Sequence, residues 1–366
     1  MYNCKFYKYS TRLFMQHLQT LDSAFLDPKN ALKLYDLDIF TLGKMADSIR
    51  QSYFNKKVFF NTNRHINPTN ECADICKFCG FSAHRKNPNA YTMDKEQVLQ
   101  IARDSIQAGA LELHIVGAHN PKLNLEWYLD LFKALKQEFP KVHIKALTAA
   151  EVNYLSTISN KSHAEVLNLM AENGVDSMPG GGAEIFDEGI RAYICKGKVD
   201  SNTWLKIHGI WHSLGKKSNA TMLFGHIESR EHRIDHLLRL YHQQEQSGGF
   251  NAFIPLVYQK ENNFLKVENF PSGQEILKTI AISRILLPNI PHIKAYWATL
   301  GLNLALVAQE FGADDIDGTI QREAIQSASG SNSANGLPKD TLIAEIKDAG
   351  FIPTERDSLY QILQTY

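Results

Sequence analysis

Short β-rich runs alternate with longer amphipathic segments through most of this chain, and this alternation restricts its fold more than any other feature. The longer segments have helical periodicity and end signals, such as Asp94 as N-cap with Gln97 three residues later in the segment 94–109. Strands separated by helices of ten or more residues imply right-handed βαβ units and a parallel sheet. The eight candidate strands are residues 58–62, 111–117, 142–147, 175–178, 219–224, 252–257, 292–297 and 315–316.

Eight strands over about 260 residues favour a closed or nearly closed (β/α)8 barrel of the TIM type within the α/β class. A doubly wound sheet is the alternative, because periodicity alone does not separate the two. We expect an N-terminal helical extension over residues 1–54, a barrel over 55–320 and a C-terminal helical extension over 321–366 that packs on the barrel. Apolar spacing predicts helical segments over 11–21, 39–49 and 360–366.

The charge of the chain argues against two broad classes of partner. Its 366 residues carry 39 Lys and Arg against 39 Asp and Glu, a formal net charge of zero. Coating nucleic acid or binding anionic lipid requires surplus basic residues, so we expect no nucleic acid and no membrane as partners. No stretch approaches twenty uncharged apolar residues, and the N-terminus lacks the apolar core of a signal peptide. We therefore expect a cytoplasmic protein.

The number of cysteines argues against a disulfide-bonded secreted protein, because five is odd and the chain is large. Cys4 and Cys195 are far from the other three in sequence and lack partners at ligand spacing. We interpret both as ordinary thiols.

The other three cysteines fall within eight residues, as Cys72, Cys76 and Cys79. Their C-x3-C-x2-C spacing follows the first candidate strand, at the C-terminal mouth of the expected barrel, where barrel enzymes keep their active sites. Three thiolates on one loop suit a [4Fe–4S] cluster with one iron left open for a substrate. With His84 they would instead form a Cys3His zinc site, and three structural thiols are the plain alternative.

With aromatic Phe78 directly before Cys79, the motif resembles the signature of the radical S-adenosylmethionine (SAM) superfamily. In that superfamily three cysteines hold a [4Fe–4S] cluster, and the unique iron binds the amino and carboxylate groups of SAM. Electron transfer from the cluster cleaves SAM to methionine and a 5′-deoxyadenosyl radical. The resemblance implies both cofactors here, with the three cysteines as metal ligands and catalytic centre, and a flavodoxin- or ferredoxin-type electron donor as partner.

Further blocks resemble the menaquinone-pathway, or futalosine, branch of this superfamily. Within the branch, residues 143–146 and 231–233 are most similar to the aminofutalosine synthases. The resemblance covers about residues 55–360. The matching blocks are residues 113–117, 143–151, 178–185, 219–228 and 250–255.

The resemblance implies a reaction between the adenosyl radical and 3-[(1-carboxyvinyl)oxy]benzoate. The radical adds to the enol-ether double bond, the adduct attacks the benzoate ring, the ether oxygen migrates and carbon dioxide leaves, giving 6-amino-6-deoxyfutalosine. Dehypoxanthine futalosine cyclase and the deazaflavin-forming synthases are alternatives within the superfamily. A Cys3His zinc-dependent barrel hydrolase and a non-enzymatic iron–sulfur or RNA-binding module are alternatives outside it.

The candidate contacts to SAM follow from the same resemblance. Glycines permit close backbone approach to a ligand, and Glu184 can accept hydrogen bonds from the SAM amino group or ribose hydroxyls. A tight turn and a carboxylate at a helix start are the plain alternatives. Ala118 stands where the superfamily often has a second glycine, which puts that contact in doubt. The candidate cofactor-binding residues are Phe78, Gly117, Ala118, Gly181, Gly182 and Glu184.

A substrate with two carboxylates needs cations or paired amides in its pocket. Polar and charged residues at the predicted strand ends are the candidates for these contacts or for a proton relay, and structural salt bridges are the alternative role. The candidate substrate-binding residues are His119, Lys145, Thr148, Glu151, His226, Glu228, Arg233 and Lys294.

Overall fold

The computed structural model describes residues 22–83 and 87–366. The helix expected over 11–21, Cys4 and His84 therefore lie outside the described residues. The described strands form a seven-stranded sheet in the order β2-β3-β4-β5-β6-β7-β8 and a four-stranded sheet in the order β11-β10-β1-β9. The strands are β1 (Lys57–Asn61), β2 (Asn63–Ile66), β3 (Glu112–Ile115), β4 (His143–Ala146), β5 (Ser177–Met178), β6 (Lys217–Phe224), β7 (Phe250–Val257), β8 (His292–Ile293), β9 (Asp315–Gly318), β10 (Ile352–Arg356) and β11 (Ile362–Thr365).

The predicted α/β barrel is confirmed, and each of the eight expected strand positions holds a strand. All pairings from β2 to β8 are parallel, as βαβ units require. The first expected strand corresponds to β1, which belongs to the four-stranded sheet, and the first strand of the seven-stranded sheet is β2, which the sequence pattern did not indicate. The chain changes neighbours at Thr62, between these two strands. The carbonyl of Asn61 accepts from Thr319 N (3.0 Å), whereas that of Thr62 accepts from Leu111 N (2.8 Å).

The two ends of the seven-stranded sheet are joined through β9. A single bridge between Lys294 and Asp315 connects β8 to β9, and β9 pairs with β1. On the other side, His65 N donates to the carbonyl of Ile320, just after β9 (3.1 Å). The sheet is therefore curled into a barrel whose closure depends on few hydrogen bonds.

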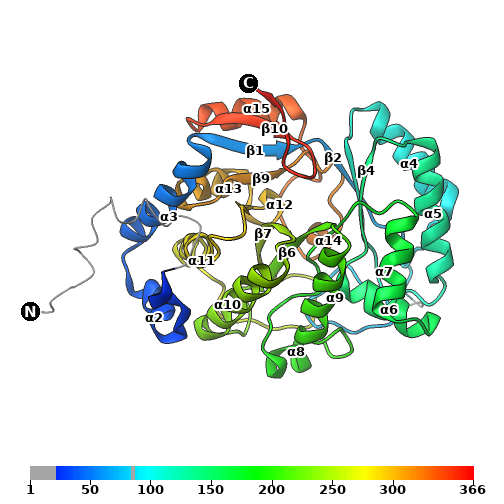
Figure 1. Ribbon diagram of the computed structural model, residues 1–366, viewed down its shortest axis with the longest axis horizontal. Helices are drawn as coiled ribbons and strands as arrows, with labels where there is room; N and C mark the ends of the chain where they lie inside the picture. The colour runs from blue at the N-terminus through cyan, green and yellow to red at the C-terminus, as the bar shows by residue number, and fades with distance from the viewer. Residues whose placement is uncertain (1–21, 84–86) are drawn as a thin grey trace, which may run out of the picture.

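Helices lie outside the curled sheet, and the N-terminal helices α2 and α3 pack beside α10 and α11 (Figure 1). The helices are η2 (Ser23–Leu26), α2 (Pro28–Leu32), η3 (Lys33–Asp36), α3 (Ile39–Phe54), α4 (Lys95–Gln107), α5 (Leu125–Glu138), α6 (Ala149–Ser159), α7 (His163–Glu172), α8 (Glu188–Ile194), α9 (Ser201–Ser213), α10 (Arg230–Ser247), α11 (Gly273–Leu286), α12 (Trp297–Leu300), α13 (Leu302–Val307), η4 (Ala308–Phe311), α14 (Ile325–Ala328) and α15 (Lys339–Asp348).

Local sequence signals determine where several of these helices begin and end. Asp94 and Gln97 form the predicted capping box of α4, each side chain accepting from the other residue's backbone N–H. Gly248 ends α10 with a φ of 59°, a left-handed conformation that glycine adopts without strain. The helix predicted over 39–49 is the first part of α3.

The expectation of a purely helical C-terminal extension is wrong. Helix α15 is present, but β10 and β11 follow it, and β11 occupies most of the segment 360–366. β10 pairs in parallel with β1 and in antiparallel with β11 (Figure 1). Because β2 rather than β1 pairs with β3, one edge of β1 is free for another strand. Periodicity over five residues cannot reveal such a pairing. The boundaries of the three expected parts stay a prediction.

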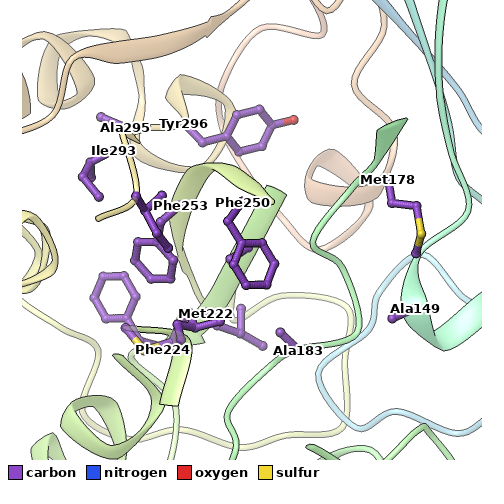
Figure 2. Packing of buried hydrophobic residues seen from close by; sticks show 14 of the residues in the cluster. Ala149, Met178, Ala183, Met222, Phe224, Phe250, Phe253, Ile293, Ala295 and Tyr296 are labelled. Atoms are coloured by element: carbon purple, nitrogen blue, oxygen red, sulfur yellow. The ribbon is translucent and has the colours of Figure 1, made fainter. Parts of the chain in front are cut away.

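Apolar side chains on the outer face of the sheet form the core under the helices. Met222 and Phe224 of β6, Phe253 of β7 and Ile293 of β8 are fully buried and lie close together (Figure 2). Burying each such side chain contributes about 1.5–3 kcal/mol. Since successive side chains alternate between faces, Ile254 lies on the inner face of β7, where it keeps partial exposure. None of the helices in the described part of the chain has the length and apolar character that crossing a bilayer requires.

Candidate active site at the cysteine loop

The three clustered cysteines lie on the loop that follows β2, whereas the sequence pattern placed them after the strand at 58–62, which is β1. Two backbone hydrogen bonds shape this loop: Cys72 N donates to Ala83 O (3.3 Å), and Cys79 N donates to Cys76 O (3.2 Å). Parallel strands place their carboxyl ends at one edge of the sheet. The loop therefore shares this edge with the segments that follow β3, β4, β5 and β6.

Distant segments anchor the cysteine loop from two sides. Lys77 N donates to Ile194 O (2.8 Å) at the end of α8. Gly80 N donates to Ser329 Oγ (3.1 Å) just after α14, and a Cβ added at Gly80 would stand 2.6 Å from the carbonyl oxygen of Ala328. The glycine is thus required for the close approach of the loop to α14.

The thiols of the loop are free and partly or fully buried. Burial raises the pKa of Cys72 and of Cys76, and the Lys198 ammonium acts on both in the opposite direction. Cys195 is close to this loop in space, although it is distant in sequence. Its burial raises its pKa to about 11, and a thiolate there would raise the pKa of Cys76 further. Cys195 is therefore distant from the cluster motif only in sequence, and its interpretation as an ordinary thiol stays a prediction.

Sequence reasoning missed Lys198, a partly buried cation beside the cysteines. Its Nζ lies 2.7 Å from Glu184 Oε1 and 5.3 Å from the centre of the Phe78 ring. Burial would lower the pKa of Lys198, but Cys76 and Glu184 raise it well above its ordinary value. The structure thus brings Glu184 close to Phe78 on the cysteine loop, with a cation between them that no motif indicates, and the contact of both residues with SAM stays a prediction.

The donor set of this loop fits an iron–sulfur cluster. Thiols are the ligands that such clusters take, and the Lys198 ammonium offsets the negative charge that thiolates bring. Within residues 22–83 and 87–366, no three His, Cys, Asp or Glu side chains are already gathered as a metal centre. This is ordinary for a metal site, because binding of the metal and ordering of the ligands are coupled.

His119 supports the cysteine loop directly. Its carbonyl accepts from Ala73 N (2.9 Å), and its Nδ1 lies 2.7 Å from Asp74 Oδ2. Its ring stacks on Tyr154 at a centroid distance of 4.7 Å. These contacts orient the loop, and the predicted role of His119 toward the substrate stays a prediction.

Glu151 joins the ends of two strands. Its Oε1 accepts from Gly117 N (2.9 Å), beyond β3, and its Oε2 accepts from Thr148 N (2.7 Å), beyond β4. Thr148 and Glu151 form the capping box of α6, so both have structural partners. Gly117 and Ala118 lie at the same edge as the cysteines, and the carbonyl of Ala118 accepts from Asn120 N (2.8 Å).

The glycine segment after β5 packs tightly against protein. A Cβ added at Gly181 would stand 2.8 Å from Thr148 Cγ2, and one at Gly182 would stand 2.8 Å from Ala150 Cβ. Gly182 also has a φ of 89°, which favours glycine. Packing therefore accounts for both glycines, and their contact with SAM stays a prediction. Glu184 has a φ of 46°, an uncommon conformation for a residue with a Cβ.

Glu228 organises the loop after β6. It accepts from Gly225 N (2.6 Å) and His226 N (2.8 Å), and its Oε1 lies 2.7 Å from Arg233 Nε. Burial lowers the pKa of His226. The Arg233 guanidinium also pairs with Glu275 (2.8 Å) and lies over the Phe224 ring on the helix side of the sheet. Arg233 is thus a neutralised cation in the helix layer, although we expected it to face the substrate.

Lys145 and Lys294 form two buried ion pairs on the inner face of the sheet. Lys145 Nζ lies 2.6 Å from Glu112 Oε2, and Lys294 Nζ lies 2.9 Å from Asp317 Oδ1. Burial lowers the pKa of Lys145, Glu112 raises it, and the charge of Lys294 lowers it further. Neither acidic partner was a predicted site residue, because each is distant in sequence from the lysine that it contacts.

Comparison with known proteins agrees with this geometry. Residues 66–240 match the model of the radical SAM superfamily, and residues 247–366 match the CofH/MqnC C-terminal region. Aminodeoxyfutalosine synthase of Thermus thermophilus is 41% identical over 343 residues, 92% of each chain. The synthase of Streptomyces coelicolor is 38% identical and covers 93% of this chain and 91% of its own.

A relative with a different name is somewhat less similar. Cyclic dehypoxanthine futalosine synthase of Streptomyces coelicolor is 35% identical and covers 92% of this chain and 86% of its own. Among solved structures, methylornithine synthase (PylB) superposes with a TM-score of 0.72 at 17% identity, over 90% of this chain and 94% of its own. At that identity the superposition supports the barrel fold alone.

The full-length similarity and the cysteine loop together establish the family. Membership implies a [4Fe–4S] cluster and SAM, and it favours the cluster over the zinc alternative. The chain belongs to the radical SAM superfamily, in the group that contains the aminodeoxyfutalosine synthases.

Proposed function

We propose that this chain catalyses the aminodeoxyfutalosine synthase reaction of menaquinone biosynthesis. It transfers the 5′-deoxyadenosyl group of SAM to 3-[(1-carboxyvinyl)oxy]benzoate, forms a C–C bond, releases carbon dioxide and yields 6-amino-6-deoxyfutalosine. The observation that carries the proposal is the similarity to two such synthases along nearly the whole chain, including the C-terminal region.

Cys72, Cys76 and Cys79 would hold the [4Fe–4S] cluster, leaving one iron open to SAM. When bound, the cluster and SAM supply the 5′-deoxyadenosyl radical, and a flavodoxin- or ferredoxin-type protein supplies the electron. Lys198 would offset the charge of the thiolates, since it already lies in their environment. His119 would keep the loop in place through Asp74.

The curled sheet supports the remaining requirements of this chemistry. A reactive radical must be kept from water and from stray hydrogen donors. The buried ion pairs of Lys145 and Lys294 place polar groups inside the barrel without unpaired charge. The two carboxylates of the substrate require hydrogen-bond donors there, and the substrate must be positioned close to SAM.

The experiment is anaerobic purification followed by turnover. Iron, sulfide and the visible spectrum are measured, and reductant, SAM and the enolpyruvyl benzoate are then supplied. We expect a brown protein that forms 6-amino-6-deoxyfutalosine, and Cys76→Ala should lose cluster and turnover together. A colourless zinc protein would overturn the proposal entirely. A brown protein that cleaves SAM without forming the adduct would keep the superfamily and exclude this reaction, and dehypoxanthine futalosine or tyrosine would then be tested as substrate.

A further inference from the structure

Two histidines and a lysine form a row across the inner face of the sheet. Strand register places His65 of β2 beside His114 of β3, and His114 beside Lys145 of β4. Lys294 lies directly after β8, at the opposite end of this sheet, yet its charge lowers the pKa of both His114 and Lys145. These side chains therefore converge on the concave side of the curled sheet.

The two imidazoles are in contact, and burial disfavours the charged form of both. His114 Nδ1 lies 3.3 Å from His65 Nε2, with the ring centroids 4.5 Å apart. Burial lowers the pKa of both histidines, and Asp317 and Glu323 only partly oppose this for His65. One proton is thus shared between the two facing nitrogens, and its position determines the tautomer of both rings.

The surroundings of His114 Nε2 determine which of the two facing nitrogens carries the proton. Its Nε2 is sealed from solvent and has no hydrogen-bond partner in residues 22–83 and 87–366. A proton there would be a buried donor without an acceptor, close to the positive charge of Lys145. The proton of His114 is therefore on Nδ1, from which it donates to His65 Nε2. His65 must then carry its own proton on Nδ1.

The Nδ1 of His65 is the open end of this pair. It has no hydrogen-bond partner within the described part of the chain, is not among the sealed nitrogens, and belongs to a side chain with partial exposure. Asp317 and Glu323, the two acidic groups named above for His65, already have partners of their own. Asp317 pairs with Lys294, and Glu323 accepts from three backbone N–H groups at the start of α14.

We infer that His65 binds one carboxylate of the substrate through Nδ1–H, and that His114 is the positioning residue that fixes the tautomer of His65. This inference rests on the proposed function and extends it to a named substrate contact. Partial exposure of Ile254 and Leu256 on the inner face of β7 provides apolar surface for the aromatic ring. The histidine pair supplies a neutral donor, so an anion can bind without an unpaired charge being buried in its absence.

Amide isosteres test the two nitrogens separately. His65→Asn keeps a donor close to the position of Nδ1, whereas His65→Gln places its amide near Nε2 and loses that donor. The measurement is equilibrium dialysis of 3-[(1-carboxyvinyl)oxy]benzoate against reconstituted holoenzyme with SAM and no reductant. We expect the dissociation constant to rise about 10- to 100-fold in His65→Gln, as for loss of one hydrogen bond to a charged group, and less than about threefold in His65→Asn.

The positioning role of His114 is tested with the same two amide isosteres and with one matched control variant. His114→Asn keeps a donor toward His65 and should bind the substrate almost normally, whereas His114→Gln should weaken binding about tenfold. His208 is also buried, with lowered pKa and a sealed, unpartnered Nε2, but it lies on α9 beside Ser218. His208→Gln should leave the dissociation constant unchanged.

Two results overturn the inference. Unchanged binding in His65→Gln removes the contact, and equal losses in His65→Asn and His65→Gln assign the effect to packing. Iron content and SAM cleavage in the absence of substrate show whether each variant is folded and loaded. A wild-type holoenzyme that cleaves SAM but does not bind the enolpyruvyl benzoate refutes the proposed function as well, whereas normal wild-type binding with normal His65→Gln binding refutes the histidine contact alone.

Discussion

The ion pair between Lys198 and Glu184 is expected to stabilise the protein and its cluster site. The two charged atoms are 2.7 Å apart, and the side chains are 19% and 11% exposed. At an effective dielectric constant of about 20, Coulomb attraction at this distance is about 6 kcal/mol. Ordering of the two side chains and residual contact with water offset roughly half of it. We therefore expect a coupling free energy of about 2–3 kcal/mol.

The assay is a double-mutant cycle of Lys198→Met and Glu184→Gln. Urea unfolding of the cluster-free protein, followed by circular dichroism, gives the free energy of unfolding for each variant. Lys198→Met alone should cost about 2–4 kcal/mol, because it leaves a buried carboxylate without a partner. Lys198→Met should also retain less iron after reconstitution, since the thiolates lose their neighbouring cation.

The control is the exposed pair of Lys95 and Asp130, whose side chains are 43% and 65% exposed. Lys95→Met should leave the unfolding midpoint unchanged, because exposed pairs contribute little. A coupling free energy within about 0.5 kcal/mol of zero for Lys198 and Glu184 would refute the reasoning. Normal iron content in Lys198→Met would refute the link to the cluster.

Three further predictions concern the loop, the barrel interior and the fourth thiol. Gly80→Ala should reduce the iron content per chain, because the added Cβ would stand 2.6 Å from a backbone carbonyl oxygen. Gly273→Ala is the control and should keep its iron, because no atom lies within 4 Å of the added Cβ. Equal iron content in both variants would count against the docking of the loop on α14. Burial would raise the pKa of Glu112, but Lys145 holds it well below its ordinary 4.5, so this carboxylate stabilises the fold above about pH 4.5 and less as the pH falls further. In Lys145→Met that pKa should rise instead, so the stability difference from wild type, measured by urea unfolding, should shrink from pH 7 to pH 4; a constant difference would contradict this. Cys195→Ser should keep its full iron content, and loss of iron would make Cys195 a ligand.

Sequence reasoning located most of the fold because its signals are local. Hydrophobic periodicity and end signals such as the capping box of Asp94 act within one helix or strand, so they are visible without tertiary structure. The segment 352–356 is one of the strands that sequence reasoning missed. Its strand depends on a free edge of β1, almost 300 residues earlier, and no local pattern reports it.

The same distinction between local and long-range features applies to the site. The spacing of Cys72, Cys76 and Cys79 was sufficient to predict the loop and its chemistry, because all three ligands lie on one short segment. The surroundings of that loop were not predictable, since Lys198 and Cys195 reach it from more than 100 residues away. Arg233 was expected to face the substrate, but its acidic partners neutralise it in the helix layer, and no local pattern indicates those partners.

The sequence by itself determined the α/β class, the positions of most strands along the chain and the cysteine motif, because each depends on neighbouring residues. Only the tertiary structure decided which charges are neutralised, which cation lies beside the thiols and which histidine nitrogen stays open. Those properties depend on distances between strands and helices remote in the chain, and on burial, which changes the pKa of a group according to what the fold places around it.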